Sequence, residues 1–164
     1  MELEIKPYHV DQTEYDRGIE TLLQRSYVDA GFTSPEIAEK IFSIEEVKKR
    51  GKILLGITTT EEVVGMIILG NEHNPYRQIA QTDEAEMQLL ATLPSHRKRG
   101  IGDRLCLDFE TEAKRSGFRN AVLSTQPSMK AAHKLYEKYG YRRNSARDWS
   151  RNDREFWVYE KKLS

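Results

Sequence analysis

One segment of the sequence restricts the fold more than any other. Residues 86–93 have the composition of a strand, which must stop at Pro94 because proline lacks the N–H group that a sheet requires. Glycines follow at positions 100 and 102, and then Leu105, Phe109 and Ala113 recur at helical spacing. Gly117 suits the C-terminal end of that helix. A strand, a glycine turn and a helix in this order predict a sheet with helices packed against it.

The rest of the chain changes between helical and strand periodicity. Upstream we expect a strand over 3–7, a helix over 15–27 that ends before Gly31, and a helix from the Thr33-Ser34-Pro35 cap to Gly51. β-Branched runs predict a hairpin over 53–59 and 63–69, followed by a polar loop over 71–84. Downstream we expect a strand over 121–125, a helix over 128–139, and strands over 141–146 and 156–161. The predicted class is α/β (α+β), with a mixed, mostly antiparallel sheet of about seven strands and four flanking helices.

Composition limits the classes of function. The 164 residues suit a single domain, 1–164, and their 26 Lys or Arg balance 26 Asp or Glu, so the net charge is zero. We therefore expect no nucleic-acid partner, since such proteins usually carry a net positive charge. Cys106 is the one cysteine, so we expect neither disulfides nor a metal site. The acidic N-terminus and the lack of an 18-residue apolar run favour a cytoplasmic protein with no membrane partner. We expect a monomer or a homodimer.

The glycine turn predicts an anion site. At a helix start several backbone N–H groups lack intrahelical partners, and the helix dipole also favours negative charge there. Gly100 and Gly102 carry no Cβ, so an anion can approach the backbone closely, beside the basic run 97–99. The alternative is a plain turn with exposed basic residues. Two common nucleotide motifs do not fit, because Leu105 replaces the third glycine of the dinucleotide motif and Asp103 follows Gly102 where a Walker loop has lysine.

Two segments carry a resemblance to a known family. Arg97-Lys98-Arg99-Gly100-Ile101-Gly102, with Pro94 upstream, resembles the acetyl-CoA-binding segment of the GNAT superfamily of N-acetyltransferases, Arg/Gln-x-x-Gly-x-Gly/Ala. The segment from Leu135 to Tyr141, LYEKYGY, is similar to the end of that family's last helix. The order of the predicted elements also agrees with the family. The resemblance implies an acetyl-CoA-dependent enzyme that acetylates a primary amine of an unidentified small-molecule or peptide acceptor, by direct transfer in a ternary complex.

The resemblance also implies which residues bind acetyl-CoA. The sheet would open between strands 86–93 and 121–125, and the first of these would pair with the pantetheine arm. The implied binding residues are Leu90, Ala91, Thr92, Arg97, Lys98, Arg99, Gly100, Ile101, Gly102, Asp103, Ser128 and Met129. Many family members have an asparagine that binds pantetheine where this chain has Ser128-Met129. The Met129 side chain cannot make the hydrogen bonds that this asparagine makes to pantetheine. Ser128 either makes them or caps the helix.

Acetyl transfer to an amine needs a proton acceptor and help for the leaving thiolate. By resemblance, Glu86 would be the general base; the alternative is that it is only a polar residue at the end of a strand. Glu84 and Asp83 are the substitutes, and a water chain is the alternative route for the proton. Tyr136 would donate a proton or a hydrogen bond to the sulfur; its alternative role is core packing beside two other tyrosines, at 139 and 141.

The acceptor is less constrained by the sequence. The resemblance places it beside residues 28–34 and the last hairpin, which gives Asp29, Phe32 and Trp149 as candidate contacts. Five arginines gather near that hairpin, at positions 142, 143, 147, 151 and 154, and indicate either an acidic acceptor or a solvated surface. The alternative function is a non-catalytic CoA-sensing or partner-binding module with the same fold.

Overall fold

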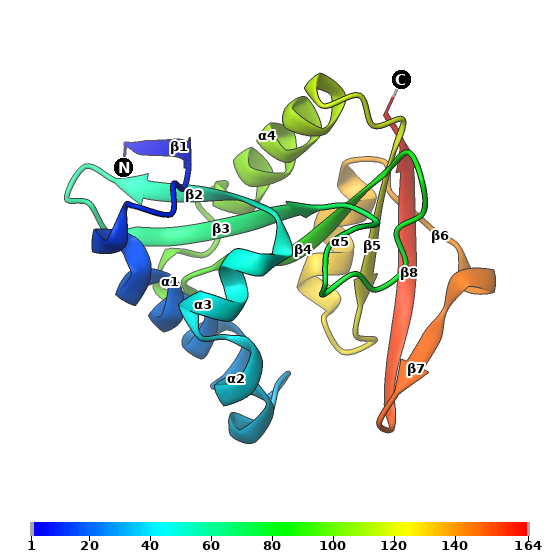
Figure 1. Cartoon of the computed structure of the whole chain (residues 1–164), viewed down its shortest axis with the longest axis horizontal. Helices are drawn as coiled ribbons and strands as arrows, with labels where there is room; N and C mark the ends of the chain where they lie inside the picture. The colour runs from blue at the N-terminus through cyan, green and yellow to red at the C-terminus, as the bar shows by residue number, and fades with distance from the viewer. Residues whose placement is uncertain (1, 164) are drawn as a thin grey trace.

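The structure is a computed structural model that describes residues 2–163. A mixed sheet crosses the molecule, and helices cover both of its faces (Figure 1). The helices are α1 (Asp16–Leu23), α2 (Pro35–Ile41), α3 (Ile44–Val47), α4 (Ile101–Arg115) and α5 (Lys130–Lys138). The strands are β1 (Leu3–Pro7), β2 (Lys52–Thr58), β3 (Val63–Gly70), β4 (Glu84–Thr92), β5 (Asn120–Thr125), β6 (Arg142–Arg143), β7 (Trp149–Arg151) and β8 (Arg154–Lys162).

The sheet has the predicted mixed and mostly antiparallel character. Its order is β1-β2-β3-β4-β5-β8-β6, with β7 paired to β8, and the β4–β5 pair alone is parallel. The predicted α/β class is therefore confirmed. The described residues form eight strands rather than about seven, because the chain between the final two predicted strands adds the short β7.

The helices number five rather than four among residues 2–163. The predicted second helix is divided after Phe42, where Ser43 adopts an extended conformation and α3 starts anew. The backbone N–H of Ile44 donates to Glu20 of α1 at 2.9 Å, so a side chain from another helix caps this new start. In addition, α1 continues as a single π-helical turn over Gln24–Val28. None of the helices among the described residues is long and apolar enough to cross a membrane.

Two close contacts place α1 and α4 on opposite faces of the sheet. A Cβ on Gly18 of α1 would lie 2.8 Å from Val63 Cγ2, and a Cβ on Gly65 would lie 2.8 Å from Ile101 Cγ2 of α4. A bulge in β3 pairs Val63 with Ile57 and Gly65 with the adjacent Gly56, so Val63 and Gly65 point to opposite faces. The helix α4 is drawn above β2 and β3, and α1 below them (Figure 1).

The sheet opens between β4 and β5. Only three residue pairs join these strands, ending with Glu86 opposite Val122, although β4 continues to Thr92 and β5 to Thr125. The opening predicted between these two strands is therefore confirmed. Within β4, Leu89 has a φ of +48°, and the register with β3 shifts between the pairs Ile68–Gln88 and Met66–Ala91. This bulge turns β4 away from β5, as bulges beside functional sites often do.

Candidate functional site

The start of α4 is exposed and open to a ligand. Gly100 occupies the N-cap with a φ of +76°, and a Cβ built there would meet no atom within 4 Å. Arg97, Lys98 and Arg99 are exposed beside it. The first intrahelical hydrogen bond runs from the Arg104 N–H to the Gly100 carbonyl, so the N–H groups of the first turn have no such partner. The fold therefore provides the predicted setting for an anion at this helix start.

The second glycine has a different structural role. A Cβ on Gly102 would lie 3.0 Å from Leu135 Cδ2, so this glycine permits the close contact of α4 with α5. The carboxylate of Asp103 accepts hydrogen bonds from Lys138 of α5 and from Tyr139, the C-cap of that helix, and the Lys138 hydrogen bond lowers the pKa of Asp103. Ile101 is buried against the sheet. Within the predicted segment 97–103, the glycine that remains open to a ligand is therefore Gly100.

A cleft occupies the opening between β4 and β5. Its volume is about 110 Å³, below the usual range for a pocket that encloses a whole ligand. It is lined by Tyr27, Thr33, Ile41, Phe42, Arg50, Gln78, Met87, Gln88, Leu89, Leu90, Ser124, Thr125, Gln126, Met129, Tyr136, Arg154 and Phe156. A larger, open hollow at the other end of β5, lined in part by Glu84 and Lys162, lies away from this cleft.

The π-helical turn after α1 contacts the exposed edge of β4. Tyr27 donates its hydroxyl to the Leu90 carbonyl at 2.9 Å, and Ser26 donates to the Thr92 carbonyl at 3.3 Å. Of the three β4 residues predicted to contact pantetheine, Leu90 lines the cleft, whereas Ala91 is buried and Thr92 half-buried outside its lining. A carbonyl oxygen has two lone pairs, so the Leu90 carbonyl can accept one further hydrogen bond.

Tyr136 reaches the cleft from α5. Its ring is buried and packs 6.1 Å from the ring of Tyr141 and 6.0 Å from that of Tyr159. Burial raises the pKa of Tyr136 well above 10, so the phenol stays protonated over the physiological range. A neutral phenol at this place can donate a hydrogen bond to a developing anion. Both predicted roles of Tyr136, cleft contact and core packing, are compatible with this position.

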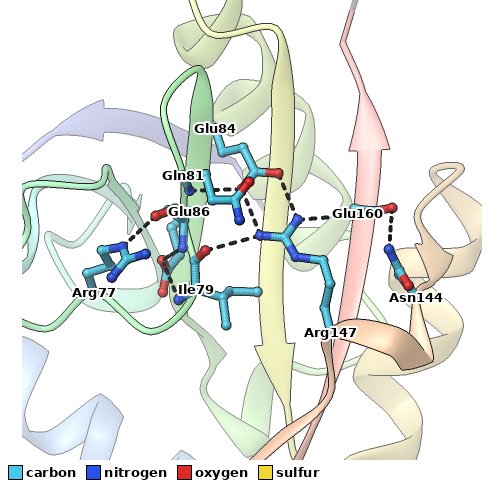
Figure 2. Close-up of polar contacts among 9 residues, drawn as sticks. Arg77, Ile79, Gln81, Glu84, Glu86, Asn144, Arg147 and Glu160 are labelled. Atoms are coloured by element: carbon cyan, nitrogen blue, oxygen red, sulfur yellow. Dashed lines mark hydrogen bonds and ion pairs between the residues drawn. The ribbon is translucent and has the colours of Figure 1, made fainter.

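Glu86 is fully buried and accepts four hydrogen bonds. One oxygen accepts the Gln78 N–H at 2.8 Å and the Gln88 side chain at 3.1 Å, and the other accepts the N–H groups of Ile79 at 3.3 Å and Ala80 at 2.9 Å. Figure 2 shows Glu86 together with Ile79 of this loop. A carboxylate offers about four lone-pair sites, so none remains free to take a proton from a substrate. The geometry therefore opposes the predicted role of Glu86 as the base and indicates that Glu86 anchors residues 78–80.

The two substitutes for Glu86 lie outside the cleft. Glu84 is buried at the start of β4, where both of its oxygens accept from Arg147 at 2.8 Å (Figure 2). Burial acts to raise the pKa of Glu84, but the hydrogen bonds from Arg147 and Gln81 outweigh it and the pKa is lowered. Arg147 also donates to the Ile79 carbonyl at 3.0 Å. Asp83 is exposed in the turn before β4. Neither carboxylate lines the cleft.

The start of α5 departs from one sequence prediction. Met129 is the N-cap of the helix and lines the cleft, with its sulfur 3.7 Å from the Thr125 hydroxyl. Ser128 is exposed and makes no side-chain hydrogen bond to the helix start, so its predicted capping role is wrong. Gln126, which the sequence prediction omitted, lines the cleft and donates its side-chain amide to the Phe32 carbonyl at 2.9 Å.

The predicted acceptor contacts lie around the cleft rather than in it. Phe32 is half-buried next to the lining residue Thr33, and Asp29 is exposed and bonded to Gln24. Trp149 stacks on the lining residue Phe156, with ring centroids 4.3 Å apart, and donates its indole N–H to Ser124 at 2.9 Å. Trp149 therefore positions cleft residues without being among those that line the cleft itself.

Sequence reasoning missed two polar residues on one wall of the cleft. Arg50 is 6% exposed and donates to the Gln88 side chain at 3.0 Å, with its guanidinium 4.3 Å from the centre of the Tyr76 ring. Gln88 also donates to the Tyr76 carbonyl at 2.9 Å. Arg50 lies directly before Gly51 in a basic run, Lys48-Lys49-Arg50, that has the composition of a solvated helix end. No local signal separated Arg50 from Lys48 and Lys49, which are half-buried and exposed.

Comparison with curated proteins gives partial matches. The chain is 35% identical over 86 residues to the aminoalkylphosphonate N-acetyltransferase of Salmonella typhimurium, which covers 52% of this chain and 54% of that protein. It is 29% identical over 116 residues to the probable N-acetyltransferase 14 of Xenopus tropicalis, with 71% of this chain and 52% of that protein covered. The chain thus spans about half the length of these relatives.

Solved structures match over nearly the whole chain. The PaiA N-acetyltransferase of Thermoplasma acidophilum, solved in complex with coenzyme A, superposes with a TM-score of 0.76 at 19% identity, over 99% of both chains. An acetyltransferase of Streptococcus agalactiae gives a TM-score of 0.75 at 23% identity, over 98% of both chains. These likenesses establish the fold. The model of the acetyltransferase (GNAT) family matches residues 17–141, and the chain therefore belongs to the GNAT family.

Proposed function

We propose that this protein is an N-acetyltransferase that moves the acetyl group of acetyl-CoA to a primary amine by direct transfer in a ternary complex. One observation carries the proposal: the open start of α4 contacts α5 through Gly102 and Leu135, and the next residue of α5, Tyr136, lines the cleft in the sheet opening. An anion-binding helix start, an unpaired strand edge and a buried proton donor are the three features that a thioester substrate with a pyrophosphate requires.

Different residues around the opening would bind different parts of acetyl-CoA. The N–H groups from Arg97 to Asp103 would hold the pyrophosphate, with Gly100 leaving room for it. The β4 edge at Leu90 would bind the pantetheine arm, and Met129 would contact it through apolar surface instead of the hydrogen bonds of an asparagine. Acetyl-CoA supplies an activated acetyl thioester, whose C–S bond breaks as the new C–N bond forms.

The chemistry also requires the loss of a proton from the amine. At pH 7 an amine with a pKa near 10.4 is mostly protonated, and presenting the free base costs about 4–5 kcal/mol. No Asp or Glu is among the residues that line the cleft, so we assign this proton to water rather than to a carboxylate. Tyr136 would donate a hydrogen bond to the departing sulfur. Full proton transfer from so weak an acid to a thiolate is unfavourable, so a hydrogen bond is the expected form of help.

A thermal shift tests the substrate part of the proposal. Acetyl-CoA at 100 times its Kd should stabilise the protein by about 2.7 kcal/mol, which raises the Tm by about 5–11 °C at this chain length. Gly100→Glu should abolish the shift. The matched control is Gly117→Glu at the other end of α4, because Gly117 has a similar φ of +89° and equally open space. An unshifted wild-type protein would refute acetyl-CoA binding.

Release of free CoA thiol tests turnover. Acetyl-CoA is incubated with amines, amino acids, polyamines, aminoglycosides and peptides, and the thiol is followed with a chromogenic reagent. Release that depends on an acceptor and yields the acetylated amine by mass spectrometry supports the transferase. Tight acetyl-CoA binding without release for any acceptor would instead support the non-catalytic CoA-sensing module.

A further inference from the structure

The cleft carries an unusual balance of charge. Among its lining residues Arg50 and Arg154 are cationic, and none is an aspartate or a glutamate. Neither arginine has a carboxylate oxygen within 4 Å among residues 2–163. An unpaired arginine on the surface is ordinary because water solvates it. Arg50 is buried and Arg154 is half-buried, so the charge of Arg50 in particular needs a partner, because desolvating it is costly.

Both guanidinium groups also have a buried N–H without a partner. The Nε atoms of Arg50 and Arg154 are shielded from solvent and make no hydrogen bond within the described part of the chain. Arg50 is held in place by Gln88 and by the Tyr76 ring, and Arg154 lies 5.2 Å from the centre of the Phe156 ring. These contacts hold Arg50 in place, but they neutralise neither charge. A planar guanidinium with free donors matches an oxyanion.

The two arginines face the same side of the sheet. Side chains two residues apart on a strand point to the same face of the sheet, so Arg154 and Phe156 share a face with Val158. Val158 pairs with Ser124 of β5, and the side chain of Ser124 therefore lies on this face too. Arg50 is bonded to Gln88, which shares a face of β4 with Glu86. Glu86 pairs with Val122 of β5, which shares a face with Ser124, so Gln88 lies on the same face of the sheet. This face is the one remote from α4. The arginines therefore lie across the sheet from the anion site at Gly100.

We propose that the acetyl acceptor is an amine that also carries an oxyanion group, a phosphonate, phosphate or carboxylate, and that Arg50 and Arg154 bind this group. The inference rests on the proposed function and specifies its acceptor. The same two charges assist the chemistry, because nearby cations disfavour the ammonium form of the amine and so lower the cost of the free base. A polyamine or an aminoglycoside would find two like charges and no carboxylate in the cleft.

Matched amines test the charge requirement. The acceptors are 2-aminoethylphosphonate, phosphoethanolamine and β-alanine, with ethanolamine as the neutral amine and putrescine as the dication. We expect kcat/KM for at least one anionic amine to exceed that of ethanolamine by about 10- to 100-fold, the range of one charge-assisted hydrogen bond. The ranking among phosphonate, phosphate and carboxylate then identifies the oxyanion. Equal rates for anionic and neutral amines, or a preference for putrescine, would overturn the inference.

Variants test the two arginines. Arg154→Gln and Arg50→Gln should each lower kcat/KM for the preferred anionic amine by about 10- to 100-fold and lower that for ethanolamine by a clearly smaller factor. The control is Arg17→Gln, which removes an exposed charge on α1 far from the lining residues. Arg154→Gln keeps the test valid if the buried Arg50 variant fails to fold. Equal losses for anionic and neutral amines in Arg154→Gln would refute the assignment of Arg154.

A binding arm separates this inference from the proposed function. Ethylphosphonate and propionate lack the amine, so they cannot react, and their binding to the CoA complex is measured by calorimetry with wild type and Arg154→Gln. Binding that the variant loses supports the anion site even if no amine is acetylated. If acetyl-CoA binds and an amine is acetylated but neither anion binds nor inhibits, the proposed function stands and the inference fails.

Discussion

Replacing Glu86 by glutamine tests whether this residue anchors a loop or removes a proton. The substitution keeps the size of the side chain and turns one of its oxygens into an NH2 donor. Each oxygen faces two donors, namely the Gln78 N–H and the Gln88 side chain at one and the Ile79 and Ala80 N–H groups at the other. In either orientation of the new amide, two donors lose their acceptor and face another donor.

The cost follows from the number of donors left unpaired. A buried donor without a partner costs about 1–3 kcal/mol, and the Gln88 side chain can turn to recover part of its loss, so we expect a total of about 2–4 kcal/mol. At this chain length the Tm should fall by about 5–15 °C. The control is Glu39→Gln on the exposed side of α2, where the change should stay within about 0.5 kcal/mol.

Two measurements distinguish an anchor from a base. Scanning calorimetry gives the Tm of both variants, and amide hydrogen exchange with mass spectrometry follows residues 78–80, whose N–H groups should exchange faster in Glu86→Gln. A base would show the opposite pattern. An unchanged Tm and unchanged exchange, together with loss of kcat and loss of the acidic limb of its pH profile, would refute the anchoring role.

Three further substitutions test other parts of the fold and the site. Tyr136→Phe should lower kcat by about 10- to 1,000-fold with little change in Tm. The matched Tyr141→Phe removes a buried hydroxyl that makes no hydrogen bond to the described residues 2–163, and it should leave kcat unchanged. Gly65→Ala should destabilise the protein by about 1–3 kcal/mol in urea unfolding, because its Cβ would lie 2.8 Å from α4, whereas Gly56→Ala on the paired strand has contacts of 3.5 Å or more and should be neutral. Arg147→Met should lower stability by about 2–3 kcal/mol at pH 7, because it leaves the buried carboxylate of Glu84 without its cation. The pKa of Glu84 is lowered in the folded protein, so the stability that this ion pair supplies is present above about pH 4.5 and is lost as the pH falls. The difference in stability between variant and wild type should therefore shrink in acid.

The sequence predicted best where the signal was local. Pro94, Gly100 and the apolar spacing from Leu105 act within a few residues of each other, and the structure has a strand that ends before Pro94 and a helix that begins directly after Gly100. The family resemblance depended on the same short segments. The positions that follow from local backbone chemistry were therefore accessible without a structure, as was the position of Tyr136 on α5.

The predictions failed or fell short where distant residues decide the outcome. Glu86 has the sequence context of a strand residue near a cleft, but its partners come from a loop six to eight residues upstream that folds back over β4. Arg50 meets Gln88 across 38 residues of sequence and also contacts the Tyr76 ring, and these distant contacts separate it from the two lysines before it. Division of the second helix likewise depends on a cap from Glu20 of α1. Periodicity and spacing carry no information on such pairings.

The short β4–β5 pairing accounts for the arrangement of the whole site. Had the pairing continued beyond Glu86 and Val122, the β4 edge at Leu90 would be satisfied by β5, and Tyr136 would be closed off beneath the sheet. The bulge at Leu89 and the hydrogen bonds from Ser26 and Tyr27 hold β4 in its divergent course. The opening joins the α4 face, with the anion site proposed at Gly100, to the opposite face, with Arg50 and Arg154. On both proposals, two anionic substrates would approach from opposite sides with their charges separated by the sheet, and only their reacting ends would meet in the cleft.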